Sequence, residues 1–210
     1  MTLCRFNDIL IMKWGNIMKK STKNTKGKIV TAAWKLFYEY GYDETTVEDI
    51  IYESGTSKGS FYHYFEGKDS LLGTLSFLFD EKYEELIPRI PEDMNSVDVL
   101  IFLNKELFAM IEDSIAINLL SGLLSTQLVT KGEKHLLDRT RVYYKLLRQI
   151  VTKGQQKGEI RNDLSVGEVV KMYAMAERSL MYDWCLCNGE YSLSSYARNA
   201  MPIFLSGIRI

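Results

Sequence analysis

The sequence is poor in cysteine, histidine, proline and glycine, and each shortage excludes a class of protein. Its three cysteines, Cys4, Cys185 and Cys187, make no disulfide framework and fit a reducing cytosol. The two histidines, His63 and His135, lie far apart and share no ligand spacing with the cysteines, so neither a metal nor another cofactor is expected. The 3 prolines and 14 glycines are too few for a turn-dense β-sandwich and favour helices.

The chain also lacks an excess of charge and a long apolar run. Its 26 basic and 27 acidic residues give a formal net charge of −1, which by itself indicates no nucleic-acid partner. The apolar run at residues 9–12 is flanked by Asp8 and Lys13, and the run at 115–128 is interrupted by Asn118, Ser121, Ser125 and Gln127. Neither fits a signal sequence or a membrane span. We therefore expect a cytoplasmic protein with no membrane partner.

Apolar residues recur at helical spacing along the chain, separated by glycines, prolines and capping residues, and no useful segment has strand spacing. This pattern predicts an all-α fold. Capping boxes are expected at Thr45–Glu48, Thr130–Glu133 and Ser165–Glu168. About nine helices are predicted, over approximately 29–40, 46–54, 57–64, 68–87, 96–111, 114–129, 130–151, 165–184 and 192–205.

Two of these helices are short and are joined by a turn that contains Gly55, which is a helix-turn-helix layout. Thr56 or Ser57 is expected to cap the second helix. That helix begins with small or extended side chains, which suit a major groove about 12 Å wide. Gly59 allows close approach of the backbone, Lys58 offers a charge to a guanine edge or a phosphate, and the hydroxyls of Ser57 and Ser60 can bond bases or phosphates.

One segment of the chain resembles the TetR family of bacterial transcriptional regulators. It runs from Gly41 to Phe65, GYDETTVEDIIYESGTSKGSFYHYF, and is followed by Gly67-Lys68-Asp69-Ser70-Leu71. The resemblance covers about Lys26–Leu75. It implies an N-terminal three-helix DNA-binding domain over residues 19–70 and a larger helical domain for effector binding and dimerisation over 71–210. Residues 1–18 have no counterpart in the family and are expected to be a disordered arm or to follow from a start codon placed too far upstream.

The DNA contacts expected from this combination involve eight residues. The turn Ser57–Ser60 faces the groove, and Tyr62 and His63 lie one turn further on, where they can reach phosphate oxygens. The family resemblance adds Thr46 and Lys68 as contacts to the DNA backbone. The basic stretch Lys19–Lys28 is expected to attract phosphates as a flexible arm, with a merely solvated tail as the alternative. Phe61, Tyr64 and Phe65 are assigned to packing. The expected DNA contacts are Thr46, Ser57, Lys58, Gly59, Ser60, Tyr62, His63 and Lys68.

The larger domain shows no catalytic motif, metal spacing or phosphate loop. It is rich in tyrosine, phenylalanine, methionine and leucine, which indicates a close-packed core with a dimer interface around Val169–Trp184 and Ser192–Leu205, or a cavity for an apolar or aromatic effector. Glu177 either faces a cationic ligand or is a solvated or salt-bridged residue. The candidate effector contacts are Leu75, Phe79, Tyr83, Tyr173 and Glu177.

These observations predict a homodimeric regulator that binds a palindromic operator in double-stranded DNA, as a repressor released by a small-molecule effector. An activator, or a regulator without an effector, would use the same fold and stays open. A helical enzyme with a DNA-binding appendage is the remaining alternative, although the sequence offers it no paired acid and base.

Overall fold

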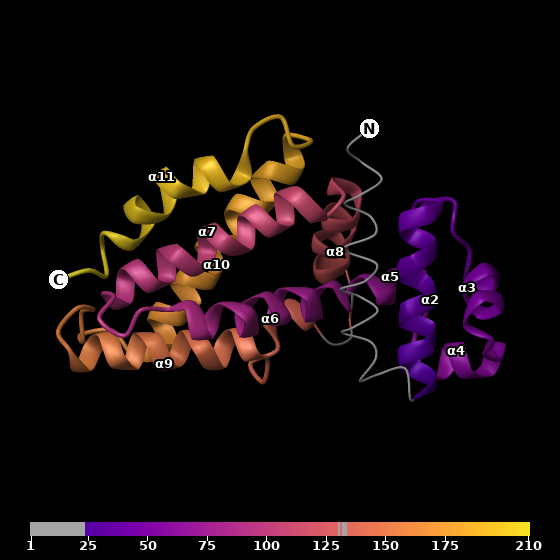
Figure 1. Ribbon diagram of the computed structural model, residues 1–210, viewed down its shortest axis with the longest axis horizontal. Helices are drawn as coiled ribbons and strands as arrows, with labels where there is room; N and C mark the ends of the chain where they lie inside the picture. The colour runs from indigo at the N-terminus through magenta and orange to yellow at the C-terminus, as the bar shows by residue number, and fades with distance from the viewer. Residues whose placement is uncertain (1–23, 130, 132–133) are drawn as a thin grey trace. The chain divides into compact units, whose positions relative to one another are not determined.

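The computed structural model describes residues 24–129, 131 and 134–210, and within these ranges the chain is built of α-helices without a strand. An isolated antiparallel bridge joins Ile160 to Arg209. The helices are labelled in Figure 1: α2 Thr25–Glu39, α3 Val47–Ser54, α4 Lys58–Tyr64, α5 Lys68–Leu72, α6 Leu75–Leu86, α7 Ser96–Ser114, α8 Ile117–Val129, α9 Val142–Gln156, α10 Val166–Leu186 and α11 Leu193–Leu205, with short 3-10 turns at Ile87–Arg89 and His135–Leu137.

The all-α prediction is confirmed, and contacts divide the chain into two compact units. Of the described residues, those from 24 to Leu78 and those within Asn118–Leu136 form the first unit, and Phe79–Ile117 and Leu137–Ile210 form the second. Among the described helices, none is by itself long and apolar enough to cross a membrane, and α7 and α8 meet that criterion only when they are counted together.

Helix α2 begins earlier than its apolar stripe suggested. Asn24 caps it by accepting a hydrogen bond from the Gly27 backbone N–H at 2.8 Å. Lys26 and Lys28 therefore lie in a helix, and the prediction of a flexible arm is wrong for these two residues. The rest of the expected arm, including Lys19, Lys20 and Lys23, lies outside the described residues, as does the N-terminal extension.

The N-cap of α3 is Thr46, so the capping box predicted at Thr45 and Glu48 is wrong by one residue. The Thr46 hydroxyl accepts from the Asp49 N–H at 3.1 Å, and the Asp49 carboxylate accepts from the Thr46 N–H at 2.9 Å. Thr45 is buried instead, and its hydroxyl donates to the Gly41 carbonyl at 2.7 Å. Gly41 has a φ of +92°, so the chain turns at this residue. The Thr45 hydroxyl bonds to this turn and is therefore not available to cap α3.

We expect Thr46→Ala to lower the free energy of unfolding by about 1 kcal/mol, because it leaves the Asp49 N–H without its side-chain partner. Thr46→Ser keeps a hydroxyl at the cap and should restore most of that loss. Urea unfolding followed by circular dichroism measures both variants. An unchanged midpoint for Thr46→Ala would contradict the cap assigned here.

The single long helix predicted over Lys68–Ile87 is interrupted at Gly73 and Thr74. The Thr74 hydroxyl donates to the Leu71 carbonyl at 2.6 Å and accepts from the indole N–H of the buried Trp34 at 2.8 Å. Side-chain bonds of this kind compete with the helical ladder. A Cβ on Gly73 would lie 2.2 Å from the His135 ring, so only glycine allows these two segments to approach so closely. Tertiary contacts of the first unit thus accompany the break.

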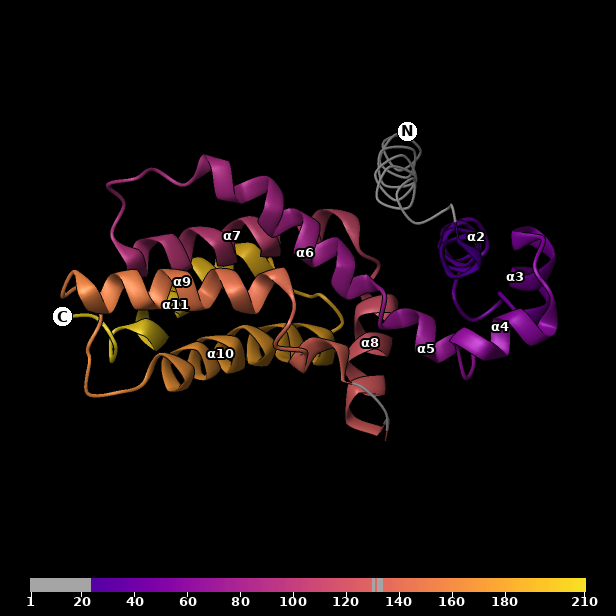
Figure 2. The ribbon, with the colours of Figure 1, turned by 90° about the horizontal axis from the view of Figure 1, so that it is seen from below.

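In the second unit, α7 packs against α11 and α9, and α10 packs against α9 and α11. Figure 2 shows these helices lying side by side as a bundle. The capping box at Ser165 and Glu168 is confirmed. Helix α9 begins at Val142, so the helix predicted from residue 130 starts too early, and both Thr130 and Glu133 lie outside the described residues. Helix α11 continues through Pro202 to Leu205.

Candidate nucleic-acid interface

Helix α4 is the element that presents the predicted recognition turn. Of the two expected caps, Ser57 is the one used, and its hydroxyl accepts from the Ser60 N–H at 3.1 Å. Gly55, at the end of α3, has a φ of +62° and reverses the chain between the two helices. Phe61 is fully buried, and helix α4 packs against α2 and α3 (Figure 2). The first unit therefore has the geometry of a helix-turn-helix.

The burial pattern of α4 separates a packed face from an exposed one. Phe61 and Phe65 are buried, which confirms their assignment to packing, whereas Tyr64 is 41% exposed and packs only in part. Most of the predicted DNA contacts lie at the surface, with Ser60 and Lys68 half-buried. The exposed members of this set are Thr46, Ser57, Lys58, Gly59, Tyr62 and His63.

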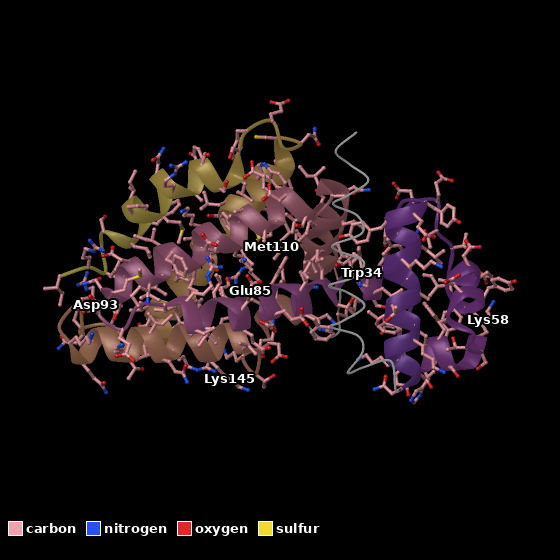
Figure 3. The ribbon with its side chains drawn as sticks, in the orientation of Figure 1. Trp34, Lys58, Glu85, Asp93, Met110 and Lys145 are labelled. Atoms are coloured by element: carbon pink, nitrogen blue, oxygen red, sulfur yellow. The ribbon has the colours of Figure 1, made fainter. Side chains whose placement is uncertain are left out.

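Lys58 forms an ion pair with Glu48 of α3, with 3.2 Å between its Nζ and the carboxylate. Both side chains are about two-thirds exposed, at 67% and 69%, and Lys58 stands at the outer edge of α3 and α4 in Figure 3. The Lys58 ammonium lowers the pKa of the Glu48 carboxyl by hydrogen bonding. A pair this exposed is weak, so a phosphate can compete with Glu48 for the lysine.

Lys68, at the first position of α5, is held by the loop that precedes α3. Its ammonium donates to the carbonyl of Tyr42 at 2.6 Å and to that of Asp43 at 3.2 Å, and it lies 4.4 Å from the centroid of the Tyr42 ring. Burial and a hydrogen bond to Asp69 raise the pKa of the Tyr42 hydroxyl. Tyr42 was not among the predicted site residues, although it lies in the segment that resembles the TetR family.

Several acids of this unit have partners of their own, which reduces their repulsion toward DNA. Glu48 pairs with Lys58, Asp49 binds the cap of α3, and Glu53 accepts from Lys35 at 2.6 Å. The hydrogen bonds from Thr46 lower the pKa of the Asp49 carboxyl. The charges of Glu48 and Glu53 are therefore partly offset by lysines, whereas Asp49 stays ionised.

The predicted effector contacts do not form one set. Leu75 belongs to the first unit, whereas Phe79, Tyr83, Tyr173 and Glu177 belong to the second, and all five side chains are buried. Glu177 is only 3% exposed, so the alternative of a solvated glutamate is wrong.

In the structure, Glu177 accepts hydrogen bonds from two residues that were not predicted as site residues, Asn104 and Tyr143. The amide of Asn104 donates to one oxygen of Glu177 at 3.0 Å, and the Tyr143 hydroxyl donates to the other at 2.5 Å. Burial raises the pKa of the Glu177 carboxyl, and these two hydrogen bonds act in the opposite direction. The sequence offered one sign of this buried polar cluster, which is the amide residue Asn104 among the apolar residues of α7.

Comparison with known proteins agrees with this geometry. Residues 29–75 match the family described as "Bacterial regulatory proteins, tetR family". The chain is 28% identical over 190 residues to the fatty acid metabolism regulator protein of Bacillus subtilis (strain 168), covering 86% of this chain and 94% of that protein.

Two solved structures of similar fold are transcriptional regulators with bound ligands. The regulator FadR of Bacillus subtilis in complex with stearoyl-CoA has a TM-score of 0.60 at 24% identity, over 87% of this chain and 98% of that one. Thermus thermophilus FadR, a repressor in complex with lauroyl-CoA, has a TM-score of 0.68 at 19% identity, over 89% and 96% of the two chains.

Proposed function

Because the chain is a DNA-binding transcriptional regulator of the TetR family, we propose that it acts as a homodimeric repressor that a small-molecule effector releases from a palindromic operator. The observation that carries the proposal is the first turn of α4, where Ser57, Lys58 and Gly59 are exposed directly before the buried Phe61. In this proposal residues 19–70 bind DNA and residues 71–210 bind the effector and the second subunit, in the cytoplasm.

The DNA contacts divide into those that read bases and those that hold phosphates. Lys58 and the hydroxyls of Ser57 and Ser60 stand at the leading turn of α4, where side chains can reach base edges in the major groove. Tyr62 and His63 lie further along the same helix. Thr46 and Lys68 lie at the first turns of α3 and α5 and would contact the DNA backbone.

The dimer would form through α10 and α11. Met172, Met175 and Leu186 recur at helical spacing on α10 and are 47%, 53% and 72% exposed, and on α11 Ile203 and Phe204 are 73% and 50% exposed. Helices α10 and α11 pack against each other, and exposed apolar side chains on both indicate a protein interface. Two-fold symmetry would place two copies of α4 at half-sites about 34 Å apart or at a multiple of that spacing.

The effector in this proposal is an amphipathic compound with a long apolar body. Its chemical class is suggested by the related regulators in complex with stearoyl-CoA and lauroyl-CoA. The effector and the operator must oppose each other reciprocally, with a coupling of about 1–3 kcal/mol. A repressor is favoured over an activator because Thermus thermophilus FadR is a repressor.

We expect Lys58→Ala and Lys68→Ala to weaken operator binding in different ways. Loss of Lys58 should relax discrimination at one base pair of each half-site. Loss of Lys68 should weaken binding equally on all operator variants and lower the magnitude of the salt slope by about one per half-site, because it removes a phosphate contact. Electrophoretic mobility shifts on promoter fragments at several salt concentrations measure both effects.

Lys105→Ala, an exposed lysine of α7 in the second unit, is the matched control and should leave operator binding unchanged. The thermal midpoint is measured in parallel, because Lys68 also holds the Tyr42 and Asp43 carbonyls. Equal losses for the Lys58 and Lys68 variants on every sequence would show that Lys58 is only a phosphate contact. No binding of the wild-type chain to any promoter fragment would contradict the proposed function.

A further inference from the structure

We propose that the buried cluster of Tyr83, Asn104, Tyr143, Tyr173 and Glu177 binds a hydroxyl group carried on the apolar body of the effector. The inference rests on the proposed function, since it assumes an effector in the second unit. It adds a chemical requirement that an apolar core alone would not impose. The effector would be a hydroxylated chain or ring rather than a plain hydrocarbon.

The cluster gathers polar groups from four helices of the second unit. Tyr83 comes from α6, Asn104 from α7, Tyr143 from α9, and Tyr173 and Glu177 from α10. Each of these side chains is buried, and the rings of Tyr83 and Tyr143 lie 5.2 Å apart between centroids. A carboxylate surrounded in this way by aromatic rings is unusual, because a buried charge is costly unless it is paired.

The hydrogen bonds of the cluster leave one acceptor and one donor incompletely used. Glu177 accepts from Asn104 at 3.0 Å and from Tyr143 at 2.5 Å, and a carboxylate has about four acceptor positions. The Tyr173 hydroxyl already donates to the Leu100 carbonyl at 2.8 Å. The Tyr83 hydroxyl, fully buried, makes no hydrogen bond of normal length and angle to a described residue. Such an unsatisfied group is costly in a folded protein.

A hydroxyl group meets both needs at once, because it can donate to the Glu177 carboxylate and accept from the Tyr83 hydroxyl. An ammonium group has no lone pair and would leave the Tyr83 donor unused. An alkyl chain would form no hydrogen bond with either group and would exclude any other partner, such as water, from both. Tyr143 links the two groups, because its ring centroid lies 5.2 Å from that of Tyr83 and its hydroxyl donates to Glu177 at 2.5 Å.

The same cluster is connected to α6 through Tyr143. The Tyr143 hydroxyl binds Glu177, and its backbone N–H donates to Asp80 of α6 at 3.2 Å. Asp80 lies one turn before Tyr83 on that helix. A ligand that bonds to Tyr83 would therefore act directly on α6, and a displaced Tyr143 would act on the same helix through Asp80.

The test compares acyl-CoA ligands of equal chain length with and without one hydroxyl, placed near the thioester, at mid-chain or at the end. Calorimetric titration of the full chain should show that at least one hydroxylated ligand binds about tenfold more tightly than its plain counterpart. Tyr83→Phe should abolish that preference without lowering stability, because its hydroxyl makes no hydrogen bond of normal length and angle that would be lost. Tyr191→Phe removes the hydroxyl of a tyrosine outside the cluster, one that donates to Asp183 at 2.8 Å, and should retain the preference.

Release of operator DNA by the same ligands is measured separately. Equal binding of hydroxylated and plain chains overturns the inference and shows that water or nothing satisfies the cluster. In that case release of DNA by both ligands leaves the proposed function standing. A hydroxyl preference without DNA release supports the inference and contradicts effector-controlled repression. If no acyl-CoA binds, both the inference and the acyl effector are wrong.

Discussion

Arg141→Ala should lower the free energy of unfolding by about 3–5 kcal/mol, because it leaves a buried carboxylate without its partner. The Arg141 guanidinium donates from Nε and Nη2 to the two oxygens of Asp80, at 2.9 and 3.0 Å. The two side chains are only 7% and 14% exposed. Asp80 also accepts from the Tyr143 N–H, so the pair joins α6 to the beginning of α9.

The matched control is Asp98→Ala, which breaks an ion pair with Arg209 whose side chains are 51% and 44% exposed. That change should alter stability by less than about 1 kcal/mol, because surface pairs are screened by water and salt. Urea unfolding followed by circular dichroism measures both variants. If Arg141→Ala destabilised the protein no more than Asp98→Ala, the Asp80 pair would contribute nothing beyond a surface contact.

Met175→Glu should reduce operator affinity at least a hundredfold by preventing dimer formation. Met175 is 53% exposed on the same face of α10 as Met172 and Leu186. In a two-fold dimer this face meets its own copy, so the substitution would place two desolvated carboxylates near each other. In a dimer, binding at the first half-site holds the second subunit at a high effective concentration near the other half-site. A monomer loses this gain, which commonly raises operator affinity by a factor of about 100 or more.

Thr152→Glu adds the same charge to an exposed position of α9 and serves as the control. Sedimentation equilibrium at micromolar concentration should give a dimer for the wild type and for Thr152→Glu, and a monomer for Met175→Glu. Circular dichroism should show that all three chains are folded. A Met175→Glu chain that remained dimeric and kept its operator affinity would place the interface elsewhere.

The sequence by itself determined the fold class and the place of the recognition helix. Helical spacing of apolar residues is a local property, and in the helix predicted over 29–40 the residues Ile29, Ala33 and Phe37, which recur at that spacing, are buried. The cap at Ser57 and the turn at Gly55 are also local, since each depends on a few neighbouring residues. For the same reason the helix-turn-helix could be found without knowledge of the rest of the chain.

Tertiary structure decided the cap of α3, the break between α5 and α6, and the environment of Glu177. Thr45 and Thr46 are equally good N-cap candidates in the sequence. They differ in the structure because the Thr45 hydroxyl donates to the Gly41 carbonyl, which leaves Thr46 as the cap. The helix breaks where Thr74 meets Trp34, 40 positions away in the chain. Glu177 can be buried because Asn104 and Tyr143, 73 and 34 positions away, each donate a hydrogen bond to one of its oxygens. Partners so distant in sequence leave no periodic signal, because their proximity exists only after the helices have packed.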